Sequence, residues 1–344
     1  MSVSSVRVAR ATIRDVAQKA GVSIATVSRV FNHSETVDER TLDRVKQAAL
    51  ELRYVPNQVG RSLSTKRTSA LGLLLPDLFG EFFSEVIRGA DQTAQQNQYH
   101  LVVSSSHNNK EEIEAALRMM RGRVDGLVIM SPHIDAQSLQ ENLPHDLPVT
   151  LLNCHVDGNV HDSLNIDNFG GAYQMVHHLL NHGHRRIAIL KGTDQNLDAE
   201  ERLRGYRQAL TSSGVQVEEV YECSGNFSEA SGFDAAKKLL SLSPLPTAIF
   251  ASNDSMAIGA LSALRDAGVQ VPSDMALAGF DDIPVCAYLT PSLTSVHVSV
   301  DRLGVLAVTN VLAAVKAKNA HKPQQSVLAT TLSIRESCGC IRQS

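Results

Sequence analysis

The sequence predicts an α/β protein with a small all-α head and a larger body of parallel α/β sheets. From residue 70 onward, runs rich in Val, Ile and Leu alternate with segments of helical periodicity, which is typical of parallel sheets covered by helices on both faces. Residues 12–55, by contrast, carry helical periodicity alone. Charge divides the chain near the same place, because residues 1–70 hold 12 Lys and Arg against 6 Asp and Glu, a net +6. The remainder holds 20 against 30, a net −10.

This charge asymmetry and the composition limit the possible functions. A basic head on an acidic body indicates that the head meets a polyanion, although mutual attraction of head and body would give the same asymmetry. The 344 residues contain no apolar stretch near the roughly 20 residues that cross a membrane, and the N-terminus lacks a secretory signal. Five Cys, an odd number, fit a reducing compartment. We therefore expect a cytoplasmic protein with no membrane partner.

Two short helices joined by a glycine open the head. Thr12 is placed to cap the first helix, Gly21 ends it, and Ser23 is placed to cap the second. A third helix over about 38–53 closes a small apolar core. The second helix leaves small or polar residues on its outer face: Ile24, Ala25, Thr26, Ser28, Arg29 and Asn32. This arrangement predicts a helix-turn-helix.

The outer face of the second helix suits a DNA major groove. Thr and Ala side chains can touch a thymine methyl group, and Arg29 and Asn32 can reach phosphates or bases. An ordinary three-helix mini-domain with a polar face is the alternative interpretation. The basic charge of the head favours the DNA-binding one.

The run IRDVAQKAGVSIATVSRVFN, followed by YVPN at 54–57, resembles the head of the lactose-repressor (LacI/GalR) family of bacterial transcription regulators. The likeness covers nearly the whole chain after about residue 11. It implies a DNA-binding domain over 11–55 in which Ile24 and Ala25 begin the recognition helix and choose the operator sequence. Our candidate DNA contacts are Thr12, Ser23, Ile24, Ala25, Thr26, Ser28, Arg29, Asn32, Asn57, Arg61 and Leu63.

The segment PNQVGRSLSTKR, residues 56–67, is almost but not quite a helix. The resemblance implies a hinge helix and linker over 56–69 that forms on DNA, with Leu63 as a wedge between base pairs. So short a segment is not a stable helix alone in water, where even about 12 residues are marginal. Gly60 stands where the family usually has Ala, and Gly costs roughly 0.8–1 kcal/mol in a helix. We therefore expect a weak hinge.

The body shows eight clear strand patterns and one weaker one. The expected strands cover 71–76, 100–105, 126–131, 149–153, 186–192, 247–252, 275–280 and 294–298, with 163–167 as a further candidate. The expected helices cover 82–97, 110–121, 168–182, 199–213, 229–241, 254–267 and 300–318. This is too much for one sheet, and it predicts two lobes that face each other across a cleft.

The family resemblance implies a body like the periplasmic sugar-binding proteins, in which the chain crosses between the lobes three times. We expect an effector-binding and dimerisation domain over 70–337. Its first lobe is expected to span about 70–160 plus 285–318. The second is expected to span about 162–284 plus 319–337.

Polar and aromatic residues at strand ends are the candidate effector contacts, because ligands of open α/β sheets bind at the carboxyl ends of the strands. From their positions we select Phe82, Phe83, Asn153, Arg202, Phe227, Asn253 and Asp281. A guanidinium suits vicinal hydroxyls or a carboxylate, and an aromatic ring suits a flat apolar ligand face. The resemblance assigns effector contacts to Arg202, Asn253 and Asp281 and an aromatic wall to Phe227. Each residue taken alone also fits a helix cap, an ion pair or the core.

Departures from the family pattern concern the same pocket. Gly80 and Glu81 replace Asn-Pro after the first strand, Cys154 replaces an Arg, and Val298 replaces a Gln. We therefore expect a pocket that is less polar than a typical pentose or hexose site. A sugar or sugar derivative is the leading effector, and nucleobases are the rival, because the purine repressor shares the Arg, aromatic and Asp pattern.

Enzyme and metal functions find little support in the sequence. His178 and His182 are four residues apart on a helix, but no acid lies between them as in H-E-x-x-H. Cys338 and Cys340 have no second Cys pair for zinc. The chain has no G-x-S-x-G, P-loop or G-x-G-x-x-G. We expect no catalytic residue, metal or cofactor.

These observations together predict a homodimeric, ligand-responsive transcriptional repressor that binds a pseudo-palindromic operator. A soluble ligand-binding module whose head does not bind DNA is the alternative. The effector's identity, the choice between release from DNA and loading onto it, the operator and the step from dimer to tetramer do not follow from the sequence.

Overall fold

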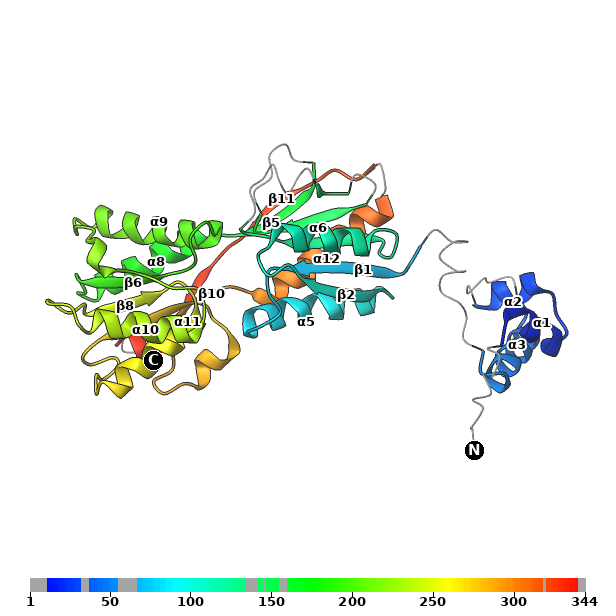
Figure 1. The fold of residues 1–344 in the computed structure, drawn as a ribbon, viewed down its shortest axis with the longest axis horizontal. Helices are drawn as coiled ribbons and strands as arrows, with labels where there is room; N and C mark the ends of the chain where they lie inside the picture. Colours follow the sequence, from blue (N-terminus) through cyan, green and yellow to red (C-terminus); the bar gives the residue numbers. More distant parts are fainter. Residues whose placement is uncertain are drawn as a thin grey trace, which may run out of the picture. The chain divides into compact units, whose positions relative to one another are not determined.

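The chain folds into two compact units, a head that ends at Thr68 and a body that begins at Ser69 (Figure 1). The structure is a computed structural model, and it describes residues 11–31, 37–54, 67–133, 142–144, 147–154, 160–317 and 320–339. Several sequence candidates lie outside the described residues: Asn32, Asn57, Gly60, Arg61, Leu63 and Cys340.

The described part of the head consists of the three expected helices. They are α1 (Ile13–Ala20), α2 (Ile24–Phe31) and α3 (Glu39–Glu51). Val16, Val27 and Val45, one from each helix, are completely buried and meet in the core. Gly21 sits between α1 and α2 with φ of 64°, a left-handed conformation that glycine adopts without strain.

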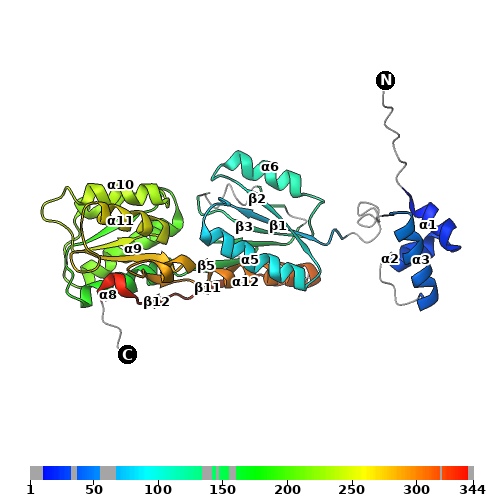
Figure 2. The same cartoon turned by 90° about the horizontal axis from the view of Figure 1, so that it is seen from below.

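The first sheet of the body is parallel, with the strand order β11-β5-β4-β3-β1-β2. Its strands are β1 (Ala70–Leu75), β2 (His100–Ser105), β3 (Gly126–Met130), β4 (Val149–Leu152), β5 (Asp162–Ile166) and β11 (Gln325–Leu328). The helices α5 (Glu81–Gln96) and α12 (Val300–Ala317) cover one face, and α6 (Lys110–Met120) covers the other (Figure 2). The fully buried β1 and β3 explain why these strands read as unbroken apolar runs.

The second sheet has the order β12-β10-β9-β8-β6-β7, and β12 is its antiparallel member. Its strands are β6 (Ile187–Lys191), β7 (Glu222–Ser224), β8 (Ala248–Ala251), β9 (Ala276–Asp281), β10 (Thr294–His297) and β12 (Thr331–Ser333). One face carries α8 (Asn168–Asn181) and α9 (Leu197–Ser212), and the other carries α10 (Glu229–Leu239) and α11 (Asp254–Asp266) (Figure 2). This lobe also contains three short 3₁₀ segments: η1 (Glu219–Tyr221) before β7, η2 (Pro284–Tyr288) between β9 and β10, and η4 (Glu336–Cys338) after β12.

The chain passes between the two lobes at three points, and these differ from the expected boundaries. β5 pairs with β4 in the first sheet, although residues from 162 onward are predicted above to belong to the second lobe. β10 pairs with β9 in the second sheet, although 285–318 are predicted to belong to the first lobe. β11 pairs with β5 and therefore returns to the first sheet before β12 joins the second. Strand pairing, which depends on contacts far apart in sequence, decides these memberships.

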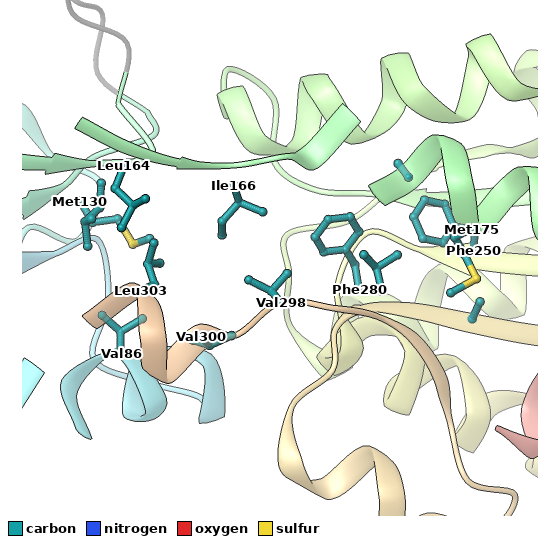
Figure 3. Packing of buried hydrophobic residues seen from close by; sticks show 14 of the residues in the cluster. Val86, Met130, Leu164, Ile166, Met175, Phe250, Phe280, Val298, Val300 and Leu303 are labelled. Carbon is teal, nitrogen blue, oxygen red and sulfur yellow. The ribbon is translucent and has the colours of Figure 1, made fainter. Parts of the chain in front are cut away.

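An apolar core runs continuously through the crossing segments (Figure 3). Leu164 and Leu303 belong to it in the first lobe, and Phe280 belongs to it in the second. Ile166 and Val298 lie between these two groups, where β5 leaves the first sheet and β10 leaves the second. The lobes therefore share buried apolar side chains at their hinge in addition to the covalent links.

Within the part of the chain that the structure describes, no helix is both long and apolar enough to span a lipid bilayer.

Candidate functional site

The first candidate site is the outer face of α2 in the head. Thr12 caps α1 through a capping box, in which its hydroxyl accepts a hydrogen bond from the Asp15 amide and the Asp15 carboxylate accepts one from the Thr12 amide at 2.7 Å. The Ser23 hydroxyl accepts a hydrogen bond from the Thr26 amide at 3.1 Å. Both predicted cap residues therefore hold a helix N-terminus, and both remain exposed.

The remaining described DNA candidates lie on α2. Ile24, Ala25 and Arg29 are exposed, whereas Thr26 and Ser28 are half-buried. Ile24 is 45% exposed at the N-terminus of α2, so its side chain is available to contact a partner, such as a thymine methyl group.

The second candidate site is a cleft between the two lobes of the body. It consists of two overlapping pockets: the Arg202 pocket, of about 160 Å³, and the Glu229 pocket, of about 430 Å³. The pockets share seven lining residues: Asp77, Phe82, Phe83, Asn226, Phe227, Asn253 and Asp281. The first three belong to the first lobe and follow β1, whereas Asp281 ends β9 and the other three follow strands of the second lobe. The cleft thus lies at the carboxyl ends of both sheets, as ligand sites of open α/β sheets do.

Six of the seven predicted effector contacts line this cleft, and Asn153 does not. Asn153 follows β4 and is 4% exposed. Its amide nitrogen donates to Asp198 at 3.0 Å, and its oxygen accepts from the Ile166 amide at 3.2 Å. Asn153 therefore lies behind the Arg202 pocket and holds Asp198. The prediction that Asn153 contacts the effector directly is wrong, because its side chain is buried and engaged by the protein.

Arg202 lies at the centre of the buried polar groups. Its Nε donates to the Asn168 side chain at 2.8 Å, Nη1 donates to the Ser252 carbonyl, and Nη2 lies 3.4 Å from an oxygen of Asp281. The guanidinium also lies over the Phe280 ring, 3.8 Å from its centroid. Arg202 is only 4% exposed, so these partners fix its position and hold its charge away from water.

Burial raises the pKa of the carboxyl groups around Arg202. Burial raises the pKa of Asp281 strongly, and the charge of Arg202 only partly offsets this effect. Burial also raises the pKa of Asp198. The charge of Arg202 and hydrogen bonds from Asn153 and Asn168 lower this pKa but do not cancel the effect of burial. Groups with perturbed pKa values inside a cleft are typical of functional sites.

The aromatic candidates come from both lobes. The Phe82 and Phe83 rings lie edge to face, with centroids 5.3 Å apart. Phe227 has φ of 67°, and a Cβ on Gly192 would lie 2.1 Å from its ring. The left-handed backbone of Phe227 and the absence of a side chain at Gly192 together allow the ring to lie at the cleft.

Asn253 caps α11 and positions Phe227. Its oxygen accepts from the Met256 amide at 3.0 Å, and its nitrogen donates to the Phe227 carbonyl at 2.9 Å. Asp281 has φ of 105°, another conformation that L-residues rarely adopt. Strain thus occurs at two cleft residues that follow different strands.

Several lining residues escape the sequence analysis: Asn108, His133, Asn196, Asp198, Asn226 and Glu229. Asp198 was recoverable, because it lies four residues before Arg202 on one helix face. His133 was not, because only folding brings it within 3.0 Å of Asn196.

The expected loss of polarity has a different outcome. Cys154 is buried in the first lobe, and Val298 is buried in the segment that crosses between the two lobes after β10. Neither residue lines the described cleft. The polar lining comes instead from Asp198 and the other residues missed above.

Comparison with known proteins assigns the chain to a family. Residues 12–57 match the model of the bacterial regulatory proteins of the lacI family, and residues 176–338 match that of the periplasmic binding protein-like domain. The ribose operon repressor of Escherichia coli (strain K12) is 35% identical over 301 residues, which cover 87% of this chain and 91% of the relative.

Two solved structures extend the likeness to the fold. A lac repressor dimer bound to operator and the anti-inducer ONPF has a TM-score of 0.85 at 29% identity, covering 95% of this chain and 99% of that one. A complex of the transcriptional regulator CelR with cellobiose has a TM-score of 0.71 at 32% identity, covering 95% of this chain and 100% of that one. Helix-turn-helix head, two-lobed body and relatives agree, and the chain belongs to the lacI family of bacterial regulatory proteins, as a DNA-binding transcriptional repressor and not an enzyme.

Proposed function

We propose that the interlobe cleft binds a small-molecule effector and that this binding changes the affinity of the heads for operator DNA. The observation that carries the proposal is the convergence of aromatic and charged groups from both lobes on one cleft. A ligand that contacts both lobes stabilises one arrangement of them, because its contacts differ between arrangements.

The proposed effector is a carbohydrate. Aromatic walls from Phe82, Phe83 and Phe227 suit the apolar faces of a sugar ring, and Asp281 and Arg202 suit its hydroxyls. The similarity to CelR in complex with cellobiose supports this class. A nucleobase is the second candidate, because the same aromatic walls suit a flat ring.

We propose that the protein acts on DNA as a homodimer. Each α2 then reads one half-site of a pseudo-palindromic operator in the major groove, since a two-fold protein matches a two-fold site. Candidate contacts on the described surface are Thr12, Ser23, Ile24, Ala25, Thr26, Ser28 and Arg29. The similarity to a lac repressor dimer bound to operator supports this arrangement.

The hinge over 56–69 completes the proposed DNA contact. Asn57, Arg61 and Leu63 are its candidate contacts, and Asn32 extends the α2 surface; all four lie outside the described residues. A repressor that binds chromosomal operators works where the chromosome is, so we place it in the bacterial cytoplasm, associated with the nucleoid.

Coupling between the cleft and the operator is reciprocal. Coupling free energies of this kind are typically about 1–3 kcal/mol, and the operator then changes effector affinity by the same factor as the effector changes operator affinity. This equality is an internal check on the mechanism.

The test uses full-length protein and operator fragments selected from random DNA. We expect Arg29→Ala to weaken operator binding at least about tenfold, a loss of roughly 1.4 kcal/mol, while leaving the thermal shift caused by an effector unchanged. Phe227→Ala should leave operator binding unchanged and reduce the thermal shift caused by an effector. A Phe227→Ala protein that still releases or loads DNA with normal effector sensitivity would contradict the cleft assignment.

A further inference from the structure

We infer that the effector carries no negative charge and is rich in hydrogen-bond donors, so that sugar phosphates, sugar acids and nucleotides are excluded. The inference rests on the proposed function, because it concerns the ligand of the same cleft. It follows from three features of the cleft. Its one lining cation already has partners, its helix N-termini are already capped, and Oδ1 of the buried Asp281 has no hydrogen-bond partner among the described residues.

Arg202 is the only Lys or Arg among the residues that line the two described pockets. Its guanidinium already has Asn168, the Ser252 carbonyl and Asp281 as partners and is stacked on Phe280. Five acidic residues line the same pockets: Asp77, Glu81, Asp198, Glu229 and Asp281. Burial raises the pKa of Asp198 and Asp281, and without these two the lining still holds three acidic residues against one cation. His133 adds no compensating charge, because burial lowers its pKa and favours the neutral ring.

Helix N-termini at the cleft could still attract an anion, because they combine free amides with a positive dipole end. The protein's own side chains already use them. Asn196, Ser228 and Asn253 accept hydrogen bonds from the first turns of α9, α10 and α11. Each first turn also contains a carboxylate, at Asp198, Glu229 and Asp254.

The N-terminus of α5 is occupied in the same sense. Glu81 lies in its first turn, and the Glu81 carboxylate accepts a hydrogen bond from the Val285 amide of the other lobe at 3.2 Å. A ligand phosphate would therefore meet a lining acidic residue at three of these helix ends, at Asp198, Glu229 and Glu81, whereas Asp254 at the fourth is buried away from the pockets. Like charges in a desolvated interface repel each other and weaken binding.

Asp281 is the lining residue that favours a ligand with hydrogen-bond donors. It is 5% exposed, it lines both pockets, and its Oδ1 has no hydrogen-bond partner among the described residues. The ion pair with Arg202, at 3.4 Å, is too long to satisfy that oxygen as a hydrogen bond. Burial without a donor disfavours the ionised form of Asp281 and raises its pKa, so a ligand hydroxyl or N–H that donates to Oδ1 stabilises the ionised form and gains free energy.

Uncharged polyols meet these requirements: sugars with free hydroxyls bring several donors and no charge. A sugar bearing an amine brings a donor and a positive charge, and it is compatible with the same carboxylates. A phosphate or carboxylate brings acceptors only, to a cleft that already has a surplus of acceptors.

The experiment compares matched compounds that differ mainly in charge, using the full-length protein. Thermal shift and calorimetry are run with glucose and glucose 6-phosphate, ribose and ribose 5-phosphate, galactose and galacturonate, glucose and glucosamine, and adenosine and AMP. We expect a neutral member to bind, its anionic partner to bind at least about tenfold more weakly, and an amine to be tolerated.

Variants test which residues produce the selectivity. Asp281→Asn keeps the shape but removes the charge, so it should weaken the neutral ligand and narrow the difference between the neutral and the anionic member of a pair. The matched control is Asp266→Asn, which removes one exposed carboxylate at the end of α11, away from the cleft lining. It should leave both affinities unchanged.

Two outcomes would overturn the inference. The first is an anionic compound that binds more tightly than its neutral partner and loses this binding in Phe227→Ala. The second is an Asp266→Asn protein in which the affinity difference between neutral and anionic compounds shrinks as much as it does in Asp281→Asn. The proposed function fails differently. A neutral ligand that binds in the cleft as described but leaves operator affinity unchanged would support the ligand class and contradict the regulatory coupling.

Discussion

Asp281 and Asp282 are adjacent in sequence, yet the fold places them in opposite environments. Asp281 faces the cleft, where burial raises its pKa. The Asp282 carboxylate forms an ion pair with Arg335, whose Nη1 lies 2.6 Å from Oδ1, and its Oδ2 accepts hydrogen bonds from Ser333 at 2.7 Å and His297 at 2.8 Å. Burial would raise the pKa of Asp282, but these bonds outweigh it and lower the pKa. One residue is left open for a ligand, whereas its neighbour ties β10 and β12 to β9.

Replacing Asp282 should therefore destabilise the body. Asp282→Ala leaves Arg335 half-buried without its partner, and we expect unfolding free energy to fall by about 3–5 kcal/mol. Because the folded pKa is lowered, the stabilisation is present above the ordinary value near 4 and is lost as pH falls through the folded pKa. Denaturant titrations at pH 7 and pH 3.5 should show the wild-type advantage shrinking in acid. A constant difference would contradict this role.

At the scale of elements, the N-terminus of α9 forms a polar latch between the lobes. Asn196 caps α9 through its oxygen, which accepts from the Ala199 amide at 2.9 Å, so its nitrogen faces His133 of the first lobe at 3.0 Å. An amide nitrogen only donates, so this contact requires a His133 nitrogen without a proton. The Leu197 amide adds a bond to the Pro132 carbonyl at 3.1 Å.

This latch predicts a pH dependence of effector affinity. Burial lowers the pKa of His133, so its contribution is present above the ordinary value near 6.5 and is lost as pH falls through the lowered value. We expect wild-type affinity to fall in mild acid. Asn196→Asp keeps the cap but replaces the donor with an acceptor, so affinity should instead rise as pH falls. Calorimetry between pH 5.5 and 8 checks this reversal.

Asn196→Ala is the control for the latch, because it removes both the cap and the contact with His133. It should cost about 1 kcal/mol of stability and abolish either pH trend. Identical pH profiles for the wild type and Asn196→Asp would show that the latch does not take part in ligand binding.

The sequence predicts that Gly60 weakens the expected hinge helix over 56–69. Gly60 lies outside the described residues, and Ala in its place should favour the helix by roughly 0.8–1 kcal/mol per chain. We expect Gly60→Ala to tighten operator binding and to blunt the effector response. Operator titrations with and without effector measure both. Unchanged affinity would instead indicate that Gly60 permits a close backbone approach between paired hinges.

At the scale of the whole molecule, the net +6 of residues 1–70 predicts salt-sensitive DNA binding. Phosphate neutralisation releases counterions, so the logarithm of affinity should fall linearly with the logarithm of salt concentration. Arg29→Ala should reduce the slope by about 1 if Arg29 meets a phosphate, whereas Arg265→Ala on the body should leave it unchanged. A flat salt response in the wild type would contradict DNA binding by the head.

The sequence predicted the helix-turn-helix, the two-lobed α/β body and six of the residues that line the cleft. These features depend on local patterns: helical periodicity around Gly21, buried apolar strands, and polar groups directly after them. It also indicated Arg202 and Asp281, because residues at strand ends converge in any open α/β sheet.

Contacts between distant parts of the chain determine which lobe contains each strand and which polar groups line the cleft. β5, β10 and β11 change lobes because of pairings between residues far apart in the chain. Asn153 lies outside the cleft lining and donates to Asp198, whereas His133 lines the Arg202 pocket. Such choices depend on non-local contacts, which no local sequence pattern encodes.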